Sequence, residues 1–449
     1  MRRMGTMRSV FSTPLLVTGA FAGLIWIVAG VLPASAQAIA PEPADCPASL
    51  PEGTTCSSGR SADGAWFWIA RPRDWNGTLI VHAHGGPRTA EPQRDDPVED
   101  LERFSVMVSE GYAWAGSTYR RGGYGVRMAA RDTDDLRWIV WDAFGKPKRT
   151  LLHGQSWGGN VAAKAAELYA VSADGERNYD GVILTSGLLA GGTRGYAFRA
   201  DLRAVYQFYC RNHPRPTETQ YPLWQGLPEG AAMPRADIAA RVEDCTGLSL
   251  APEARTRAQA DALRNILSVV GVTADSLVSH LAWGTNLFQD MVWERLDGGN
   301  PFSNAGTTYQ GSDDDVALNQ GVERFEADPA AVAALAYDAD LTGAIVLPTL
   351  TLHARYDPTV FVEHEAIYAQ TVGGAGRSNL LTQVFTTEAL HSQLSLPQYA
   401  GLLIAMTGWL DTGEKPDAQD VVEACQSRAE TYGQPCLIDP DFVPTLPAN

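Results

Sequence analysis

The stretch Thr150-Leu151-Leu152-His153-Gly154-Gln155-Ser156-Trp157-Gly158-Gly159 is the most informative part of the sequence. Its apolar first half predicts a buried strand, and the small residues at 161–168 predict a helix that packs tightly on a sheet. A serine between glycines at such a strand–turn–helix junction is typical of a nucleophile elbow. We therefore predict Ser156 as a nucleophile and Gly154 and Gly158 as the elbow glycines. The alternative is a serine that only caps a helix at a glycine-rich turn.

Around this junction, short apolar runs alternate with helical patterns. Strands are expected at 65–70, 78–84, 112–119, 150–155 and 181–186, with helices at about 96–110 and 132–144. This alternation predicts an α/β fold with a mainly parallel sheet flanked by helices.

The strand pattern stops between residues 191 and 340, where helical patterns replace it. One of these helices begins at Asp328-Pro329, with an acidic N-cap and a proline in its first position. Strands resume at 344–352 and 380–385, followed by a helix at about 397–410 and a proline-rich tail without a pattern. We predict an α/β core of residues 37–190 and 341–449, and a helical cap of residues 191–340.

A nucleophilic serine needs a base that removes its proton and a carboxylate that orients this base. In sheets of this kind the order along the chain is serine, acid, histidine. Asp357 follows the strand expected at 344–352, and His391 follows the one at 380–385. Both thus emerge at carboxyl ends of strands, where such sheets bind ligands. We predict the triad Ser156, Asp357 and His391, with Asp338 and Asp340 as alternative acids.

The negative charge that develops on an attacked carbonyl needs hydrogen-bond donors placed in advance. One is expected to be the backbone N–H of Trp157, directly after the nucleophile. The other is expected in the loop His84-Gly85-Gly86-Pro87, where we favour Gly86. The turn at 120–125 is either a second wall of this site or a surface loop.

The first 36 residues have the features of a signal peptide. Arginines precede an apolar run at 14–32, and Ala34-Ser35-Ala36 offers a cleavage site. The alternative is an uncleaved membrane anchor. We expect a secreted or periplasmic protein without stable membrane association after cleavage. The formal net charge of −17 argues against a nucleic-acid partner.

All six cysteines lie after this segment, and their even number fits a disulfide framework. The pairing of sequence neighbours is our prediction, and scattered buried thiols are the alternative: Cys46–Cys56, Cys210–Cys245 and Cys425–Cys436. No cysteine spacing resembles a zinc site. The run Asp313-Asp314-Asp315 is interpreted as a solvated helix start capped by Ser312 rather than as a calcium site. We predict no metal and no cofactor.

Together the HGGP loop, the GQSWGG elbow, the late acid and the terminal histidine resemble the α/β-hydrolase superfamily. Within it, HGGP and SWGG are similar to the proline iminopeptidase and tripeptidyl aminopeptidase branch. This resemblance implies a helical cap between the sixth and seventh strands of the fold.

Three functions are compatible with these residues. The first is hydrolysis of a small-molecule or oligomeric carboxylic ester through an acyl-enzyme. The second is cleavage of N-terminal aminoacyl amides, which needs a cap carboxylate for the substrate's amine. Five acids are available for it: Glu253, Asp261, Asp275, Asp290 and Glu294. The third is a non-catalytic binding protein on the same fold, which an intact triad disfavours.

Overall fold

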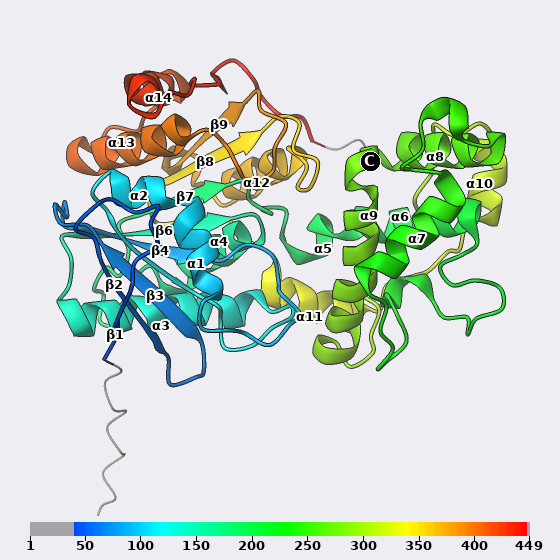
Figure 1. Ribbon diagram of the computed structural model, residues 1–449, viewed down its shortest axis with the longest axis horizontal. Coiled ribbons are helices and arrows are strands. Elements are labelled where there is room, and N and C mark those ends of the chain that lie inside the picture. Colours follow the sequence, from blue (N-terminus) through cyan, green and yellow to red (C-terminus); the bar gives the residue numbers. More distant parts are fainter. Residues whose placement is uncertain (1–39, 447–449) are drawn as a thin grey trace, which may run out of the picture. The chain divides into compact units, whose positions relative to one another are not determined.

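A ten-stranded sheet runs through residues 40–446, the part of the chain that this computed structural model describes (Figure 1). Its strands are β1 (Glu42–Ala44), β2 (Thr55–Arg60), β3 (Trp66–Arg71), β4 (Thr78–Ala83), β5 (Ala113–Ser117), β6 (Arg149–Gln155), β7 (Gly181–Thr185), β8 (Thr349–Ala354), β9 (Leu381–Thr386) and β10 (Ile438–Asp439). Their spatial order is β1-β2-β3-β5-β4-β6-β7-β8-β9-β10. The pairs from β5 to β9 are parallel, and those at both edges are antiparallel. The predicted signal peptide, residues 1–36, lies outside the described residues.

The α-helices of the described chain either cover the two faces of this sheet or belong to an insertion between β7 and β8. They are α1 (Asp96–Arg103), α2 (Ser105–Ser109), α3 (Val126–Phe144), α4 (Trp157–Tyr169), α5 (Gly191–Gly195), α6 (Ala197–Cys210), α7 (Arg235–Thr246), α8 (Arg257–Val270), α9 (Ala274–Ala282), α10 (Asp315–Gly321), α11 (Pro329–Ala339), α12 (Glu363–Gly374), α13 (Leu396–Thr412) and α14 (Ala418–Tyr432). Because strand side chains alternate between faces, Leu79 and Val81 pack with α3 and α4, whereas Ile80 packs with α2 and α13. Burial on both faces explains why the central strands are almost continuously apolar.

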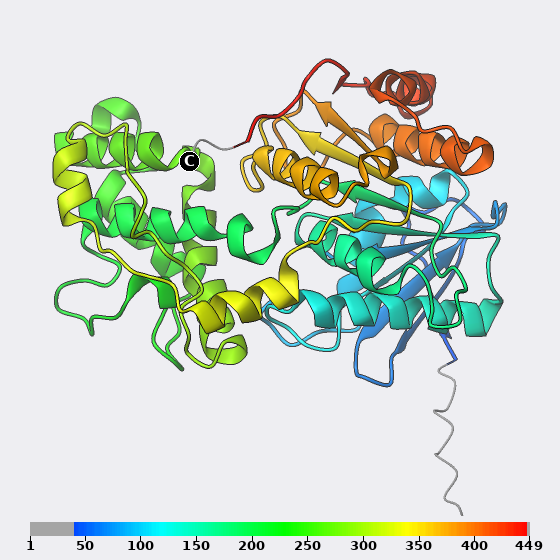
Figure 2. The same cartoon turned by 180° about the vertical axis from the view of Figure 1, so that it is seen from behind.

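The helices α5 to α11 form one insertion between β7 and β8. In Figures 1 and 2 its helices α6 to α10 gather beside the sheet instead of covering either face. The apolar core of the α3–α4 face continues into the insertion through Leu202, Leu281 and Phe288. The described residues 40–446 accordingly belong to one compact unit. The insertion follows the seventh strand of the chain, or the sixth when the short edge strand β1 is left out. The division into core and cap domains stays a prediction.

Three local expectations were wrong. The strand expected at 344–352 begins only at Thr349, because Pro348 has no N–H to donate to a neighbouring strand. The helix after the aspartate run is capped by Asp314, whose carboxylate accepts from the N–H of Ala317, and not by Ser312. The tail also has structure, namely helix α14 with an Asp417 capping box, and strand β10. Only a narrow apolar strip of α14 is buried, which left no clear helical periodicity to detect.

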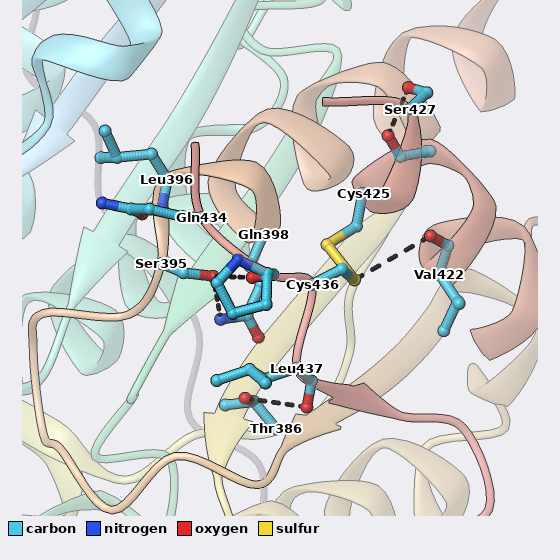
Figure 3. Close-up of a disulfide and its surroundings, with 12 residues drawn as sticks. Thr386, Ser395, Leu396, Gln398, Val422, Cys425, Ser427, Gln434, Cys436 and Leu437 are labelled. Carbon is cyan, nitrogen blue, oxygen red and sulfur yellow. Dashed lines mark hydrogen bonds between the residues drawn. A yellow bond between two sulfur atoms is a disulfide. The ribbon is translucent and has the colours of Figure 1, made fainter. Parts of the chain in front are cut away.

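The cysteines pair as predicted: Cys46 with Cys56, Cys210 with Cys245, and Cys425 with Cys436. The first ties the N-terminal segment to β2, and the second joins the ends of α6 and α7. The third joins α14 to the segment that leads into β10 (Figure 3).

Removing the last of these disulfides is expected to destabilise the fold. Its loop spans 11 positions, so the loss of the cross-link in Cys425→Ser/Cys436→Ser should lower the free energy of unfolding by about 3 kcal/mol. Urea titration followed by circular dichroism measures this change. A free energy of unfolding equal to that of the wild type would contradict it.

Among the described residues, no single helix has the length and apolar character of a membrane span. The segments Arg257–Val270 and Ala274–Arg295 reach those thresholds only as a pair, and they meet at an angle of 74°.

Candidate active site

Ser156 lies in the sharp turn between β6 and α4. Its backbone has φ 59° and ψ −126°, a strained conformation for a residue with a side chain. The turn is held because the Ser156 N–H donates to the carbonyl of Thr185 at the end of β7, at 3.0 Å, while its own carbonyl accepts from Leu188. The strand–turn–helix context expected of a nucleophile elbow is therefore present.

The elbow glycines lie where the chain passes too close to itself for a side chain. A Cβ on Gly154 would lie 2.1 Å from the carbonyl oxygen of Gly158, and a Cβ on Gly158 would lie 2.1 Å from that of Ala83. The second distance shows that the backbone at the start of α4 passes close to the end of β4. The strand that leads into the HGGP loop and the helix that follows Ser156 are thus in direct contact.

The structure brings the three predicted triad residues together. The Nε2 atom of His391 lies 2.7 Å from the Ser156 hydroxyl, and its Nδ1 atom lies 2.7 Å from Oδ2 of Asp357. The Ser156 residue and the Asp357 carboxylate are buried, and the His391 side chain is 17% exposed. These contacts join residues 235 and 34 positions apart in the sequence. Sequence order and strand-end placement had predicted this arrangement.

The carboxylate of Asp357 is fixed on both oxygens. Its Oδ1 accepts from the backbone N–H groups of Thr359 at 2.8 Å and Val360 at 3.0 Å, which leaves Oδ2 for His391. Although burial by itself would raise the pKa of Asp357, His391 and these N–H groups lower it below its ordinary value. The carboxylate is consequently ionised at neutral pH, as the orienting acid of a triad must be.

His353, at the end of β8, lies next to the Asp357 carboxylate and is fully buried. Its Nε2 lies 3.5 Å from Asp357 and its Nδ1 lies 3.2 Å from Glu365 of α12. Burial by itself would lower the pKa of His353, but the two carboxylates raise it above its ordinary value. Glu365 belongs to no motif that would have singled it out, and it supplies a second carboxylate that contacts His353.

Gly86 and Trp157, the predicted oxyanion donors, line the same cavity of about 130 Å³. Tyr119, Arg121 and Gly123 line it as well. Trp157 is the first residue of α4, where a backbone N–H has no partner within the helix. The turn at 120–125 therefore borders this cavity, whose lining does not include Ser156, Asp357 or His391, and its place in the catalytic site stays a prediction.

A buried network of polar contacts joins the first residue of the HGGP loop to α1 and β6. His84 and His82 both contact the Asp100 carboxylate of α1, and the Nδ1 atoms of His82 and His153 lie 2.8 Å apart. Although burial by itself would raise it, the two histidines hold the pKa of Asp100 well below its ordinary value. The histidines are visible in the sequence, but their common partner is not. In the sequence Asp100 cannot be distinguished from the other acidic residues of its helix.

The alternative acids lie in other environments. Asp338 accepts from the N–H groups of Val126 and Arg127 at the start of α3, and Asp340 accepts from Thr193. Asp290 is used in the same way, since it accepts from the N–H of Tyr124 at 2.6 Å and from Arg295 at 3.0 Å.

Among the described residues, one group of carboxylates has the spacing of a metal site: Asp63, Asp132 and Asp135. The guanidinium of Arg120 lies within ion-pair distance of all three. The positive charge at this point is therefore supplied by an arginine.

No protein-family model and no curated protein matches this chain. Solved structures similar to it include feruloyl esterase B from Aspergillus oryzae, with 14% identity, a TM-score of 0.44 and coverage of 81% of this chain and 82% of that one. The cell wall degrading esterase LipA from Xanthomonas oryzae has 15% identity, a TM-score of 0.37 and coverage of 80% and 88%. An esterase from Exiguobacterium antarcticum has 15% identity, a TM-score of 0.37 and coverage of 79% and 99%.

The class of fold follows from the chain's own features. A mainly parallel sheet flanked by helices carries a strained serine at a strand–helix turn, with an acid and a histidine after later strands. This is the α/β-hydrolase fold.

Proposed function

We propose that this chain is an exported serine hydrolase that cleaves a carboxylic ester through an acyl-enzyme. The observation that supports this most strongly is the continuous hydrogen-bond chain from Ser156 through His391 to Asp357, with both links at 2.7 Å. A histidine bound in this way can take the serine proton and remain oriented by the carboxylate.

In the proposed reaction, Ser156 Oγ attacks the ester carbonyl while His391 Nε2 takes its proton. The N–H group of Trp157, directly after the nucleophile, and that of Gly86 in the HGGP loop stabilise the oxyanion. His391 then protonates the departing alcohol, which leaves an acyl group on Ser156. Water then attacks the acyl carbonyl while His391 takes its proton. His391 returns this proton to Ser156 Oγ, and the carboxylic acid is released. The buried Asp357 fixes the tautomer of His391 and stabilises its cation in both halves of the cycle.

Export is proposed from two features. The first is the signal-like segment of residues 1–36, and the second is the three disulfides, which persist in oxidising compartments. Cell fractionation with detection of the processed N-terminus by mass spectrometry tests this part of the proposal.

The alternative, an aminopeptidase, needs a free carboxylate near the site to bind the substrate's amine. Asp290 borders the turn at 120–125, but its carboxylate already accepts from Tyr124 and Arg295. This occupation disfavours Asp290 as the carboxylate that would bind the substrate's amine.

A comparison of substrate classes tests the proposal directly. We expect p-nitrophenyl esters of short and medium chain length to be hydrolysed at least about 100-fold faster than aminoacyl and prolyl p-nitroanilides at equal concentration. The esters release p-nitrophenolate and the anilides release p-nitroaniline, so each initial rate is converted to molar turnover with the absorption coefficient of its own product. Faster turnover of the anilides would overturn the ester assignment and leave the triad assignment in place.

A further inference from the structure

The loop that carries the triad acid is held from the insertion as well as from the core. Two residues follow Asp357 directly, and each offers its carbonyl to a side chain of the insertion. Arg199 of α6 donates from Nη2 to the Thr359 carbonyl at 3.2 Å, and His280 of α9 lies with Nε2 2.8 Å from the Pro358 carbonyl.

The same loop positions the carboxylate. The Thr359 carbonyl that accepts from Arg199 and the Val360 N–H belong to one peptide group. This N–H donates to Oδ1 of Asp357. The Thr359 N–H donates to the same oxygen. A shift of this short segment therefore changes the direction of Oδ2, the oxygen that receives Nδ1 of His391.

Arg199 has its side-chain hydrogen bond with this loop. Its guanidinium is buried, and burial lowers its pKa to about 10. It stacks on Phe198 and Trp283 at 4.5 and 4.8 Å. Among the described residues, no carboxylate lies within ion-pair distance of it, and the Thr359 carbonyl is its hydrogen-bond acceptor. Burying a charged guanidinium costs free energy unless it is paired. The hydrogen bond to the Thr359 carbonyl is therefore the main polar interaction that compensates Arg199.

His280 acts as a neutral donor. Burial lowers its pKa to about 3, so the ring carries no charge at neutral pH. Because a carbonyl oxygen only accepts, the proton resides on Nε2 and points at Pro358. The ring also packs edge-on against Phe198, at 5.1 Å between ring centroids. Arg199 and His280 are therefore held against the same aromatic neighbour.

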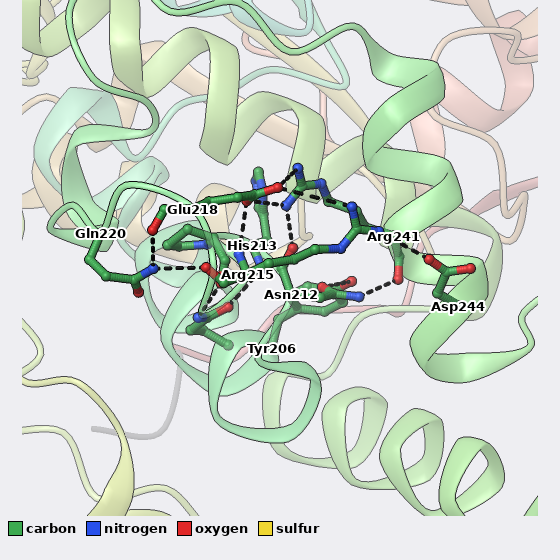
Figure 4. Close-up of polar contacts among 10 residues, drawn as sticks. Tyr206, Asn212, His213, Arg215, Glu218, Gln220, Arg241 and Asp244 are labelled. Atoms are coloured by element: carbon green, nitrogen blue, oxygen red, sulfur yellow. Dashed lines mark hydrogen bonds and ion pairs between the residues drawn. The ribbon is translucent and has the colours of Figure 1, made fainter.

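The insertion that carries these side chains is internally braced. Beyond Arg199, the end of α6 is tied to α7 by the Cys210–Cys245 disulfide and by the contacts in Figure 4. There Tyr206 donates to Asn212 at 2.9 Å, Asn212 donates to the carbonyl of Arg241 at 2.7 Å, and Arg241 binds Glu218 with two hydrogen bonds of 2.7 and 2.8 Å. A helix fixed in this way can hold a loop of the core in place.

We propose that Arg199 and His280 are positioning residues, through which the helical insertion fixes the orientation of Asp357 and hence of His391. The inference rests on the proposed hydrolase function. It makes the insertion a part of the catalytic apparatus and not only a cover over the substrate. Misplacement of a catalytic group by about 1 Å can cost on the order of 100-fold in rate.

The test compares two arginines one helical turn apart. Arg203 is as buried as Arg199, but its guanidinium bonds only to residues of the insertion, among them Leu223 and Thr285. We expect Arg199→Met to lower kcat for p-nitrophenyl butyrate about 10- to 100-fold with KM within about twofold. Arg199→Lys, which keeps a donor, should recover at least a third of kcat. Arg203→Met should lower the melting temperature similarly and leave kcat of the folded protein near that of the wild type.

His280 provides an independent pair of variants if Arg199→Met does not fold. His280→Gln keeps an N–H donor at the position of Nε2 and should retain most of kcat. His280→Phe should lose about tenfold. A kcat within twofold of the wild type in His280→Phe or in folded Arg199→Met, or equal losses of kcat in Arg199→Met and Arg203→Met, would overturn the inference.

Labelling by a fluorophosphonate probe separates this test from that of the proposed function. The probe forms an Oγ–P bond with an activated serine and releases fluoride, whatever ester the protein cleaves. An unlabelled Ser156 in the wild type would contradict the hydrolase assignment. Rapid labelling in the wild type with an equal rate in Arg199→Met would contradict only the role of the insertion.

Discussion

Replacement of Ser156 by alanine is expected to lower kcat/KM on the preferred ester by roughly 10⁴-fold or more, because no other group takes over the attack on the carbonyl. The variant should stay folded, since alanine removes one hydroxyl whose bond goes to His391 alone. Replacing the strained serine by alanine changes neither the elbow glycines nor the backbone hydrogen bond to Thr185. Initial rates and a thermal melt on the same preparation measure both effects.

The expected non-additivity is a sharper result than the loss itself. His391→Ala should lose about as much as Ser156→Ala, and the double variant should lose no more, because members of a triad act as one unit. Ser186→Ala serves as the matched control. This buried serine follows the neighbouring strand β7, also has a positive φ, and its hydroxyl has no hydrogen-bond partner in the described chain. A His391→Ala variant with a rate near that of the wild type would refute the assignment of the base.

The placement of the elbow and of the three proposed triad residues could be predicted because sequence patterns near each residue indicate it. Gly154, Ser156 and Gly158 occur at a strand–helix junction that apolar periodicity reveals, and strand ends place Asp357 and His391 on the same edge of a sheet. The disulfides could be predicted as well, since each joins cysteines that are neighbours in the sequence.

The supporting residues could not be predicted, because long-range contacts determine their partners. Arg199 bonds to a carbonyl 160 positions away, and His280 to one 78 positions away. A backbone carbonyl leaves no trace in the sequence, so neither contact has a motif. Asp100 was missed for a related reason, since its two histidines belong to β4 and its immediate continuation while it belongs to α1. The fold class is thus visible in periodicity, and the fine positioning of the site is not.

Acid is expected to lower the stability of this protein strongly, because five of its histidines have a lowered pKa in the fold. Burial disfavours their charged form in every case, and they are His82, His153, His213, His280 and His364. The pKa is lowered to about 2 for His213 and to about 3 for His280 and His364. Below pH 6.5 the unfolded chain therefore binds protons at these rings that the folded chain does not.

The sign of the effect follows from this difference in bound protons. Stability rises with pH wherever the unfolded state binds more protons, so it falls as the pH drops from 6.5. His353 does not offset this fall, because its raised pKa gives a contribution that is complete below its ordinary pKa and is lost only as the pH rises. Burial raises the pKa of the carboxyls Asp132, Asp201, Glu323 and Glu388, which gives a stabilising contribution that grows as the pH falls and counteracts part of this loss.

Between pH 6.5 and 5 each histidine whose folded pKa lies near 3 or below should therefore cost about 1.5 kcal/mol of stability. For the group we expect a loss on the order of 5 kcal/mol, a large part of the stability of a typical domain. Urea unfolding at pH 7.0, 6.5 and 5.0 measures it, and a free energy of unfolding that stays constant over this range would contradict the buried neutral histidines. His213→Gln keeps an acceptor for the 3.1 Å contact with Arg203 and removes one titrating ring. The slope of its free energy of unfolding against pH should consequently be smaller by the equivalent of about one bound proton. A purely structural role for His213 would instead lower the free energy of unfolding equally at every pH.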